Sequence, residues 1–505
     1  MTTSAITEGR DAGIGRGTTL ARALDWDLAQ PLTFAALALA FVLSRAPFLD
    51  LGYGTDPDAW RIALTGHWLW DNGEYYPSRL PGYPVPELGY ALVIQGGWIA
   101  TNLLTVAVSL GGLWFFARIV TLLRLTNRAL LVVGFAFTPL LWINSVTTMD
   151  YMWALTGLLG AYYFVLLRQN LAAALLLGFA AASRSTSLLM LLPFAVYLWR
   201  DGQRAEIRPF ISSTLAVTIL AYAPIAWRYG PQFIDFYDTK VWYLQVLRLL
   251  GKDCLGLIGA MGVIAAAAVS LPRLTRLPSD VWRDKQVMFW VIVIALTAIT
   301  FARLPHEAAY LIPLYPFGFF LMARYFRTWA LAGAIAAVVL AGFVDLTSPG
   351  DEIDSEAFTN AQLGRGLLLS NRETMRAQMA YTRDLAALEA PERTVLITGF
   401  VYPQLAVLEH DRLELGILEK DKSSISQLSD KGQATDPQRQ LIYVWLLDYD
   451  DFERFREEGY SFMYTQDGGR STAALYDYRP SIYGARLIDL GRAPSGGSGA
   501  ARTDR

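Results

Sequence analysis

The sequence predicts an α-helical polytopic membrane protein with about eleven transmembrane helices, followed by a small C-terminal extracytoplasmic α/β domain. Hydrophobic residues make up 53% of the 505 residues, charged residues make up only 17%, and the mean hydropathy is +0.30. Ordinary soluble proteins contain more charge and less apolar surface. Nearly half of the charged residues lie after residue 346. The composition therefore predicts an apolar membrane domain at residues 31–345 and a polar module at residues 346–493.

Apolar stretches long enough for membrane helices recur through the first two thirds of the chain. They lie at Pro31–Leu49, Leu88–Ala117, Ala129–Val146, Tyr151–Leu167, Leu171–Ala182, Thr186–Trp199, Phe210–Trp227, Leu255–Leu271, Val287–Phe301, Ala308–Ala323 and Thr328–Val344. Leu171–Ala182 and Thr186–Trp199 are short. The first of these also fits a re-entrant segment or an extension of its neighbour.

The basic residues beside these spans indicate the orientation, because short cytoplasmic loops are rich in Lys and Arg. The polar segment 1–30 does not look like a removable signal peptide, and we expect it to be cytoplasmic. The short loops on the same side contain Arg118, Arg124, Arg128, Arg168, Arg200, Arg204, Arg208, Arg273, Arg276, Arg283, Lys285, Arg324 and Arg327. An odd number of spans then places the C-terminal module outside the cytoplasm.

Alternating and periodic patterns define the C-terminal module. They predict helices at Ile353–Leu388 and Asp451–Glu458, and strands at Thr394–Thr398, Gln440–Leu447, Ser461–Thr465 and Ala473–Tyr478. Residues 494–505 are rich in Gly, Ser and Ala, a composition typical of a disordered tail.

Charge and cysteine content exclude some classes of protein. A formal net charge of −2 without a basic run argues against a nucleic-acid partner, since such binding needs a basic face. The single cysteine, Cys254, excludes an intrachain disulfide and a cysteine-cluster metal site.

The first extracytoplasmic loop, residues 50–87, is the most informative stretch. Asp56 and Asp58 flank Pro57 and precede Ala59–Asp71, whose apolar residues recur at helical spacing. This pattern predicts an amphipathic helix on the membrane surface. Ser78–Pro84 (SRLPGYP) then forms a stiff turn, because proline fixes φ while glycine permits other conformations.

Several charged side chains converge on the outer membrane boundary in this topology, where charge is costly and often functional. They are Asp56, Asp58, Asp150, Arg184, Arg303, His306 and Glu307. Carboxylates beside cations fit a reaction in which a carboxylate removes a proton from a hydroxyl while cations stabilise a phosphate leaving group. Structural roles are the alternatives: helix capping for the first-loop acids, a solvated turn for Asp150, and headgroup contact for the arginines.

At these residues the chain resembles the GT-C superfamily of integral-membrane glycosyltransferases, in the branch of the protein mannosyltransferases and the lipid A aminoarabinose transferases. The resemblance covers about residues 31–345. It is carried by Thr55–Arg61 (TDPDAWR), Ser78–Pro84, Thr148–Tyr151 (TMDY), Ala181–Thr186 (AASRST) and Arg303–Pro316 (RLPHEAAYLIPLYP).

The resemblance implies a polyprenyl-phosphate-linked sugar donor and inverting transfer to a lipid, glycan or protein acceptor on the extracytoplasmic face. The catalytic base would be Asp56 or Asp58, and the choice stays open because Pro57 separates a pair that is adjacent in the family. The substrate-binding residues would be Asp150, Arg79, Arg184, Arg303, His306, Glu307 and Tyr310. A divalent cation, Mg or Mn, is implied in some members, with Asp56, Asp58 and Asp150 as its ligands here.

Two other classes of function remain open from the sequence. A secondary transporter or lipid flippase would carry charge along a path through the membrane, whereas these spans hold almost none at mid-depth and show no two-half repeat. A non-catalytic assembly protein on the same scaffold is the other alternative. We expect the chain to lie in a cytoplasmic (inner) cell membrane, since it ends without an organelle retention signal.

Overall fold

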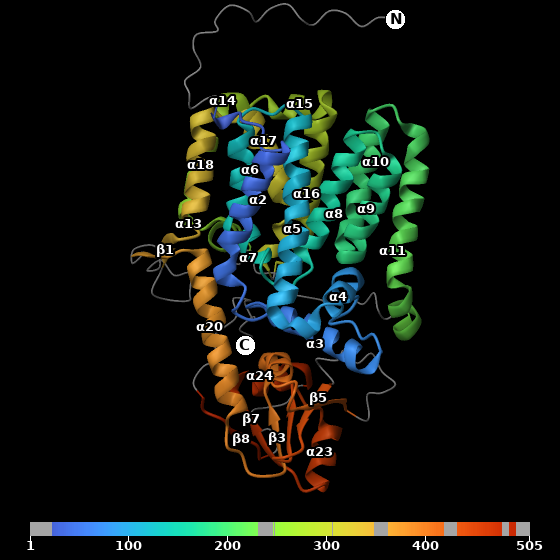
Figure 1. Ribbon diagram of the computed structural model, residues 1–505, viewed down its shortest axis with the longest axis vertical. Helices are drawn as coiled ribbons and strands as arrows, with labels where there is room; N and C mark the ends of the chain where they lie inside the picture. Colours follow the sequence, from blue (N-terminus) through green and yellow to red (C-terminus); the bar gives the residue numbers. More distant parts are fainter. Residues whose placement is uncertain are drawn as a thin grey trace, which may run out of the picture.

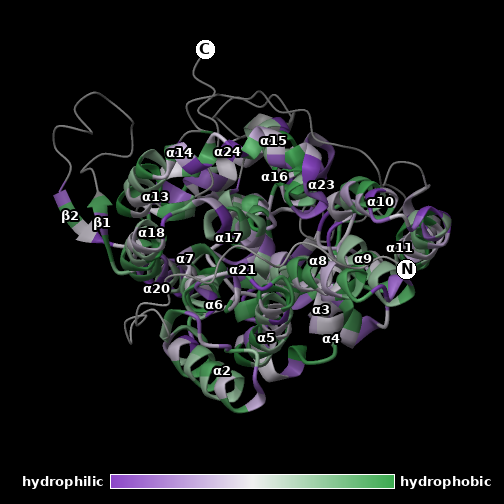
Figure 2. Ribbon diagram, turned by 90° about the horizontal axis from the view of Figure 1, so that it is seen from above, coloured by the Kyte–Doolittle hydropathy of each residue, from purple (hydrophilic) through white to green (hydrophobic). Residues whose placement is uncertain are grey.

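The computed structural model describes residues 23–230, 246, 248–305, 307–347, 362–418, 432–476 and 484–490. The first two thirds of the chain form a bundle of helices that run side by side, and an α/β module lies at one end of this bundle (Figure 1). Viewed along the bundle, hydrophobic residues occur on all the outer helices (Figure 2). The protein is thus a multi-pass membrane protein with a module outside the bundle.

Within the described ranges, four helical stretches are long and apolar enough to cross a membrane: Pro31–Phe48, Ile94–Leu122, Arg204–Tyr229 and Lys285–Arg303. They contain α2 (Pro31–Arg45), α5 (Gly97–Leu122), α11 (Ile207–Tyr229) and α16 (Lys285–Arg303). A fifth span results if α13 (Leu257–Val269) is joined to the segment Leu271–Arg283, which bends away from it by 69°. The long helices alone therefore do not account for about eleven spans.

Shorter helices lie alongside the long ones and fill the bundle (Figure 1). They are α6 (Arg128–Phe137), α8 (Tyr151–Leu166), α9 (Asn170–Ser183), α10 (Leu191–Arg200), α17 (Leu314–Tyr325) and α18 (Thr328–Leu340). The predicted span Ala129–Val146 is divided into α6 and α7 (Pro139–Asn144), because Pro139 has no amide hydrogen to continue the helix. The predicted span Leu88–Ala117 is likewise interrupted, between α4 (Pro84–Ala91) and α5.

Helices α8 and α9 pack closely because Gly157 presents no side chain at their contact. A Cβ atom at Gly157 would lie 2.8 Å from the Leu176 carbonyl oxygen and 2.9 Å from the Ala180 amide nitrogen. Small residues allow such close approach between membrane helices. The contact matters for the candidate site, since Asp150 directly precedes α8 and Arg184 directly follows α9.

Helix α3 (Pro57–Asn72) lies across the end of the bundle, between the bundle and the module (Figure 1). Its position differs from the predicted amphipathic helix on the membrane surface. Trp60, Leu64 and Trp68 are buried, and α3 packs against both α4 and the module helix α21 (Tyr402–Leu408). Trp60 packs on Tyr53 and Trp68 packs on Tyr76, so the protein itself covers the face that the sequence pattern assigned to lipid.

The module contains a six-stranded sheet in the described residues, with the strand order β4-β5-β6-β3-β7-β8. The strands are β3 (Thr394–Ile397), β4 (Glu414–Ile417), β5 (Gly432–Asp436), β6 (Leu441–Val444), β7 (Ser461–Tyr464) and β8 (Arg486–Leu487). Strands β6, β3, β7 and β8 are parallel, whereas β4 and β5 pair antiparallel. The central strands β3 and β6 are buried throughout, which fits their apolar sequences.

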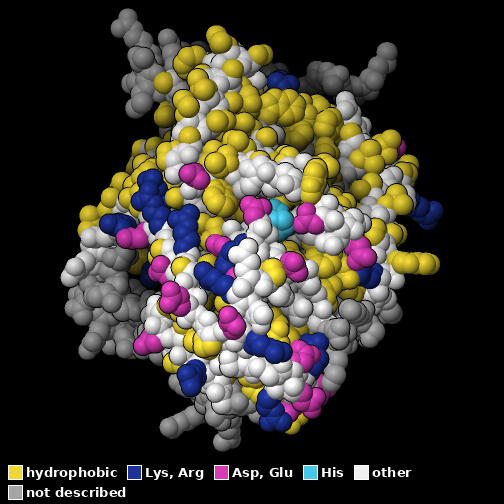
Figure 3. Space-filling model, turned by 60° about the horizontal axis from the view of Figure 1, so that its bottom comes forward, with side chains coloured by type: hydrophobic (Ala, Val, Ile, Leu, Met, Phe, Trp, Pro, Cys, Tyr) yellow, Lys and Arg dark blue, Asp and Glu magenta, His cyan; other side chains and the backbone are white. Residues whose placement is uncertain are grey.

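Two of the predicted module elements differ from the structure. The predicted helix Ile353–Leu388 is helical only at α20 (Leu367–Ala386); residues 362–365 form strand β2, which pairs with β1 (Val344–Thr347), and residues 353–361 lie outside the described residues. Residues 473–476, predicted as strand, belong to helix α24 (Gln466–Tyr476). The predicted helix Asp451–Glu458 corresponds to α23 (Tyr449–Glu457). Figure 3 shows charged side chains gathered on the module and a largely hydrophobic bundle surface above it.

Candidate active site

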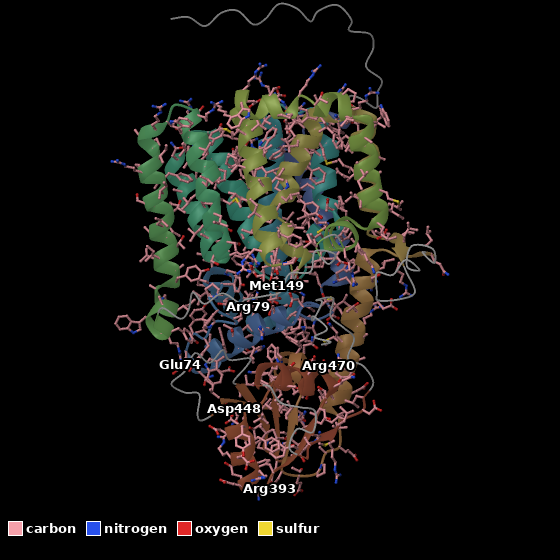
Figure 4. The ribbon with its side chains drawn as sticks, turned by 180° about the vertical axis from the view of Figure 1, so that it is seen from behind. Glu74, Arg79, Met149, Arg393, Asp448 and Arg470 are labelled. Atoms are coloured by element: carbon pink, nitrogen blue, oxygen red, sulfur yellow. The ribbon has the colours of Figure 1, made fainter. Side chains whose placement is uncertain are left out.

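A chain of ion pairs joins four segments where the bundle meets the loop at residues 50–87. Asp150 is fully buried and accepts hydrogen bonds from Arg79 Nη2 at 3.3 Å and from Arg184 Nη1 at 2.6 Å. Arg79 Nε lies 3.1 Å from Asp58 Oδ2, and Arg61 Nη1 lies 3.2 Å from Asp58 Oδ1. Arg79 and Met149 lie close to the end of the bundle that faces the module (Figure 4).

The Ser78–Tyr83 turn positions Arg79, and the carboxylate of Glu87 fixes this turn. Glu87 is fully buried at the start of α4 and accepts hydrogen bonds from the Ser78 amide at 2.8 Å, the Ser78 hydroxyl at 2.5 Å and the Tyr83 amide at 3.2 Å. The Tyr75 hydroxyl donates a further bond. Burial raises the pKa of Glu87, although these donors oppose the shift. A buried carboxylate with four donors holds its neighbours in one geometry.

A second set of hydrogen bonds holds the turn that carries Asp150. The Thr148 hydroxyl lies 2.7 Å from the Thr101 hydroxyl and 3.0 Å from the Asn102 side-chain oxygen. The Tyr90 hydroxyl donates to the Met149 carbonyl at 2.9 Å. These hydrogen bonds fix the position of Asp150, and its carboxylate orients Arg79 and Arg184.

Three tyrosine rings surround the two arginines. The Arg79 guanidinium lies 4.2 Å from the centre of the Tyr83 ring, and the Arg184 guanidinium lies 4.5 Å from Tyr151 and 4.6 Å from Tyr310. Arg79 is 8% exposed, and its Nη1 is a buried donor without a hydrogen-bond partner in the part of the chain that the structure describes. An unpaired charged donor in such a place is costly unless an anion occupies the site.

Asp56 stands beside this arginine cluster as the N-cap of α3. Its Oδ1 accepts the Asp58 amide at 2.9 Å, which confirms helix capping as one of its roles. Burial and the neighbouring Asp58 carboxylate raise the pKa of Asp56 to about 7. Burial and the charges of Asp56 and Asp58 raise the pKa of Glu307 as well. The charge of Asp56 thus acts on the Glu307 carboxyl group.

Two of the three predicted metal ligands, Asp58 and Asp150, are engaged by arginines. Both oxygens of Asp150 accept from arginines, and both oxygens of Asp58 face Arg61 and Arg79. A hard cation needs several free carboxylate or carbonyl oxygens. Among the described residues there is also no group of three or more His, Cys, Asp or Glu side chains that could hold a metal ion.

The structure brings together most of the site residues that the sequence predicts. Asp56, Asp58, Arg79, Asp150, Arg184, Glu307 and Tyr310 all belong to this group. Arg303 lies at the exposed end of α16, and the four salt bridges above do not include it. His306 lies outside the described residues.

Sequence reasoning missed Glu87, Tyr83 and Tyr151. Tyr83 and Tyr151 lie inside the motifs that carry the family resemblance, and this position in the sequence is the feature that could have identified them. Glu87 is an acidic residue in the first turn of α4, a pattern that favours a helix start. Its contacts with the Arg79 turn depend on the folded chain.

The module contributes to the border of the site. The Asn371 side-chain amide donates to the Thr55 hydroxyl at 3.2 Å, and the Gln378 side-chain amide donates to the Thr55 carbonyl at 3.0 Å, so α20 is bound to the residue before Asp56. The Arg61 guanidinium lies 3.9 Å from the centre of the ring of Trp445, the residue that directly follows β6. The loop at residues 50–87 is thus held between the bundle and the module.

Comparisons with known proteins give a distant structural likeness. No family model and no curated protein matches the chain. Among solved structures, the chain is similar to the crystal structure of ArnT from Cupriavidus metallidurans bound to undecaprenyl phosphate, with 15% sequence identity and a TM-score of 0.42. The match covers 72% of this chain and 67% of that chain. A likeness at this identity and TM-score assigns no function to the chain.

Proposed function

We propose that the protein is a glycosyltransferase that takes a sugar from a polyprenyl-phosphate donor and transfers it, with inversion, to a hydroxyl acceptor on the extracytoplasmic face of an inner cell membrane. One observation carries this proposal. A buried arginine with an open donor lies in the same group of residues as a carboxyl group whose pKa is near 7. The arginine suits the binding of a phosphate ester at the membrane boundary. The carboxyl group suits the removal of a proton at neutral pH.

The proposed reaction assigns the proton and the leaving group to different residues. The acceptor hydroxyl attacks the anomeric carbon and loses its proton to the Asp56 carboxylate. The bond between the anomeric carbon and the phosphate oxygen breaks, and polyprenyl phosphate leaves with the bonding electrons. Arg79 and Arg184 stabilise the charge on this phosphate, since fixed cations at a developing anion lower the barrier. Attack from the face opposite the leaving group inverts the anomeric configuration.

Asp56 is a better base than Asp58 in this arrangement. Asp58 faces Arg61 and Arg79 with its two oxygens, so both are engaged by cations. Asp56 accepts the Asp58 amide through one oxygen and has a pKa of about 7, which matches the proton affinity of a general base near neutral pH. Asp58 instead positions Arg79 between itself and Asp150.

The test is sugar transfer by the purified full chain in lipid nanodiscs, supplied with a panel of polyprenyl-phosphate sugars. We expect release of polyprenyl phosphate by the wild type and its loss in Asp56→Asn. Asp50→Asn is the matched control, because Asp50 lies in the same loop and accepts a hydrogen bond from the Trp98 indole. We also expect a chelator to leave turnover unchanged. Lipid movement across the membrane without transfer from any donor would instead favour the transporter or flippase alternative.

A further inference from the structure

A charged cavity lies at the end of the bundle opposite the module. It has a volume of about 630 Å³ and is lined by Trp199, Arg200, Arg204, Asp280, Arg283, Asp284, Lys285 and Arg324. These residues come from the end of α10, the start of η4 (Arg204–Glu206), helix α15 (Leu277–Arg283) and its continuation into α16, and the end of α17. We refer to this cavity as the basic basin. It shares no residue with the candidate active site.

Cations outnumber acids in the basic basin, five to two. Arg324 Nη2 lies 2.9 Å from Asp284 Oδ2, and Lys285 is paired with Asp201 just outside the lining. Arg200 donates to the Trp282 carbonyl, and Arg204 lies over the Trp199 ring. Arg200, Arg204 and Arg283 have no carboxylate partner among the residues that the structure describes. Three arginine side chains without a carboxylate partner among the described residues thus line the same cavity.

The surroundings of the basin belong to a membrane boundary. Helix α14 (Leu271–Leu274) and α15 follow the 69° bend after α13 and cross the end of the bundle (Figures 1 and 2). Trp199 is 51% exposed and Trp282 is 75% exposed at this end. Tryptophan side chains concentrate at the level of lipid headgroups, because there the apolar ring contacts lipid while the indole N–H hydrogen-bonds to water or headgroups. The basin therefore opens where headgroups lie.

We propose that the basic basin binds the phosphate of an anionic phospholipid headgroup from the leaflet opposite the active site. Basic pockets between membrane helices bind such headgroups because cations attract the phosphate and the adjoining helices contact the acyl chains. The exposed ring of Trp199 in the lining, with exposed Trp282 at the same end of the bundle, favours a lipid over a soluble phosphate, since a soluble ion gains nothing from apolar rings. In the orientation that the basic loops predict, this leaflet is cytoplasmic.

The experiment compares two variants that remove the same charge from the same end of the bundle. Arg204→Gln/Arg283→Gln removes two arginines of the basin, and Arg208→Gln/Arg276→Gln removes two exposed arginines outside it. The full chain is reconstituted in phosphatidylcholine nanodiscs that contain phosphatidylglycerol. Retained phosphatidylglycerol is counted by native mass spectrometry, and thermal unfolding verifies that both variants fold.

We expect the wild type and the control variant to retain phosphatidylglycerol equally, and the basin variant to bind it at least about tenfold more weakly. Equal losses in both variants would overturn the site, because they would show attraction by the whole charged surface. Displacement of the lipid by glycerol phosphate at matched concentration would overturn the lipid assignment in favour of a soluble anion. Sugar transfer is a separate measurement, so failure of this proposal leaves the proposed function untouched.

Discussion

At the scale of residues, the candidate site depends on which carboxylates are paired with cations and which are not. Asp58 and Asp150 hold Arg79 and Arg184 in place, whereas Asp56 keeps a raised pKa beside them. The sequence predicted these five residues, because ionisable groups at a membrane boundary are rare and stand out. It did not predict Glu87, since a buried acceptor is recognised only from the donors that the fold brings to it.

Substitution of Glu87 tests whether the Arg79 turn must be held by a carboxylate. Glu87→Gln keeps the shape of the side chain but replaces charged hydrogen bonds to Ser78 and Tyr83 by neutral ones. Hydrogen bonds to charged groups contribute about 1.5–3 kcal/mol each. We expect a lower unfolding temperature and at least about tenfold weaker turnover, measured by thermal unfolding and by transfer. Glu74→Gln, at an exposed carboxylate 3.7 Å from Arg228, should leave both unchanged.

The pH dependence of turnover should follow the carboxyl group of Asp56. Its charged form is the base, so activity is expected above pH 7 and should fall as pH drops through about 7. Asp58 raises this pKa by like-charge repulsion. Asp58→Asn should therefore move the acidic limb of the kcat profile to lower pH, besides reducing activity through the loss of a partner for Arg79. An acidic limb that stays at the same pH in Asp58→Asn would contradict this assignment.

At the scale of elements, close packing of short helices sets the distance between the charged groups. Asp150 precedes α8 and Arg184 follows α9, so the separation of these helices determines whether the two side chains meet. The periodic pattern predicted both helices, including the short Leu171–Ala182 segment. It predicted a strand at Ala473–Tyr478 where the structure has α24 over residues 473–476, because short apolar runs fit both periodicities.

The packing of α8 on α9 can be changed without touching a charged residue. Gly157→Ala would place a methyl group within 3 Å of backbone atoms of α9. Such overpacking costs about 1–3 kcal/mol, and we expect the helices to separate, with loss of thermal stability and of transfer. Gly333→Ala in α18 is the matched control, since nothing lies within 4 Å of its Cβ position. Equal effects of the two substitutions would show that the α8–α9 distance does not determine activity.

The contact between α3 and the module should weaken in acid. The rings of His67 and His410 lie 4.2 Å apart, and His410 Nε2 is 2.8 Å from Asp71 Oδ2. Burial and the charge of His410 lower the pKa of His67 from 6.5 to about 4, although the charges of Asp71 and Asp411 act in the opposite direction. The pKa of His67 is lower in the folded protein than in the unfolded chain, so the neutral ring stabilises the contact between α3 and the module. This stabilisation is present above pH 6.5 and is lost as the pH falls through 4.

Hydrogen exchange in α3 and α21, corrected for intrinsic rates, measures this contact at pH 7 and pH 5. We expect faster exchange at pH 5 in the wild type and little change in His67→Phe, which retains a ring without a titratable nitrogen. The same acid dependence in His67→Phe would locate its origin elsewhere.

At the scale of the whole molecule, function is proposed to arise where the membrane bundle, the loop at residues 50–87 and the module meet. Composition and hydropathy predicted the division into bundle and module, because both properties are sums over long stretches of chain. They did not predict that α3 packs against the module, because such contacts join distant residues: Thr55, just before α3, contacts Asn371 and Gln378 more than three hundred positions away.

The most direct measurement is release of polyprenyl phosphate from a polyprenyl-phosphate sugar by the full chain, beside binding of the same donor. We predict that Asp56→Asn binds the donor as the wild type does but loses turnover, and that Arg79→Lys, which keeps the charge but not the planar fork, binds it more weakly. Wild-type turnover in Asp56→Asn, or unchanged donor binding in Arg79→Lys, would contradict the assignment of the base and of the phosphate site.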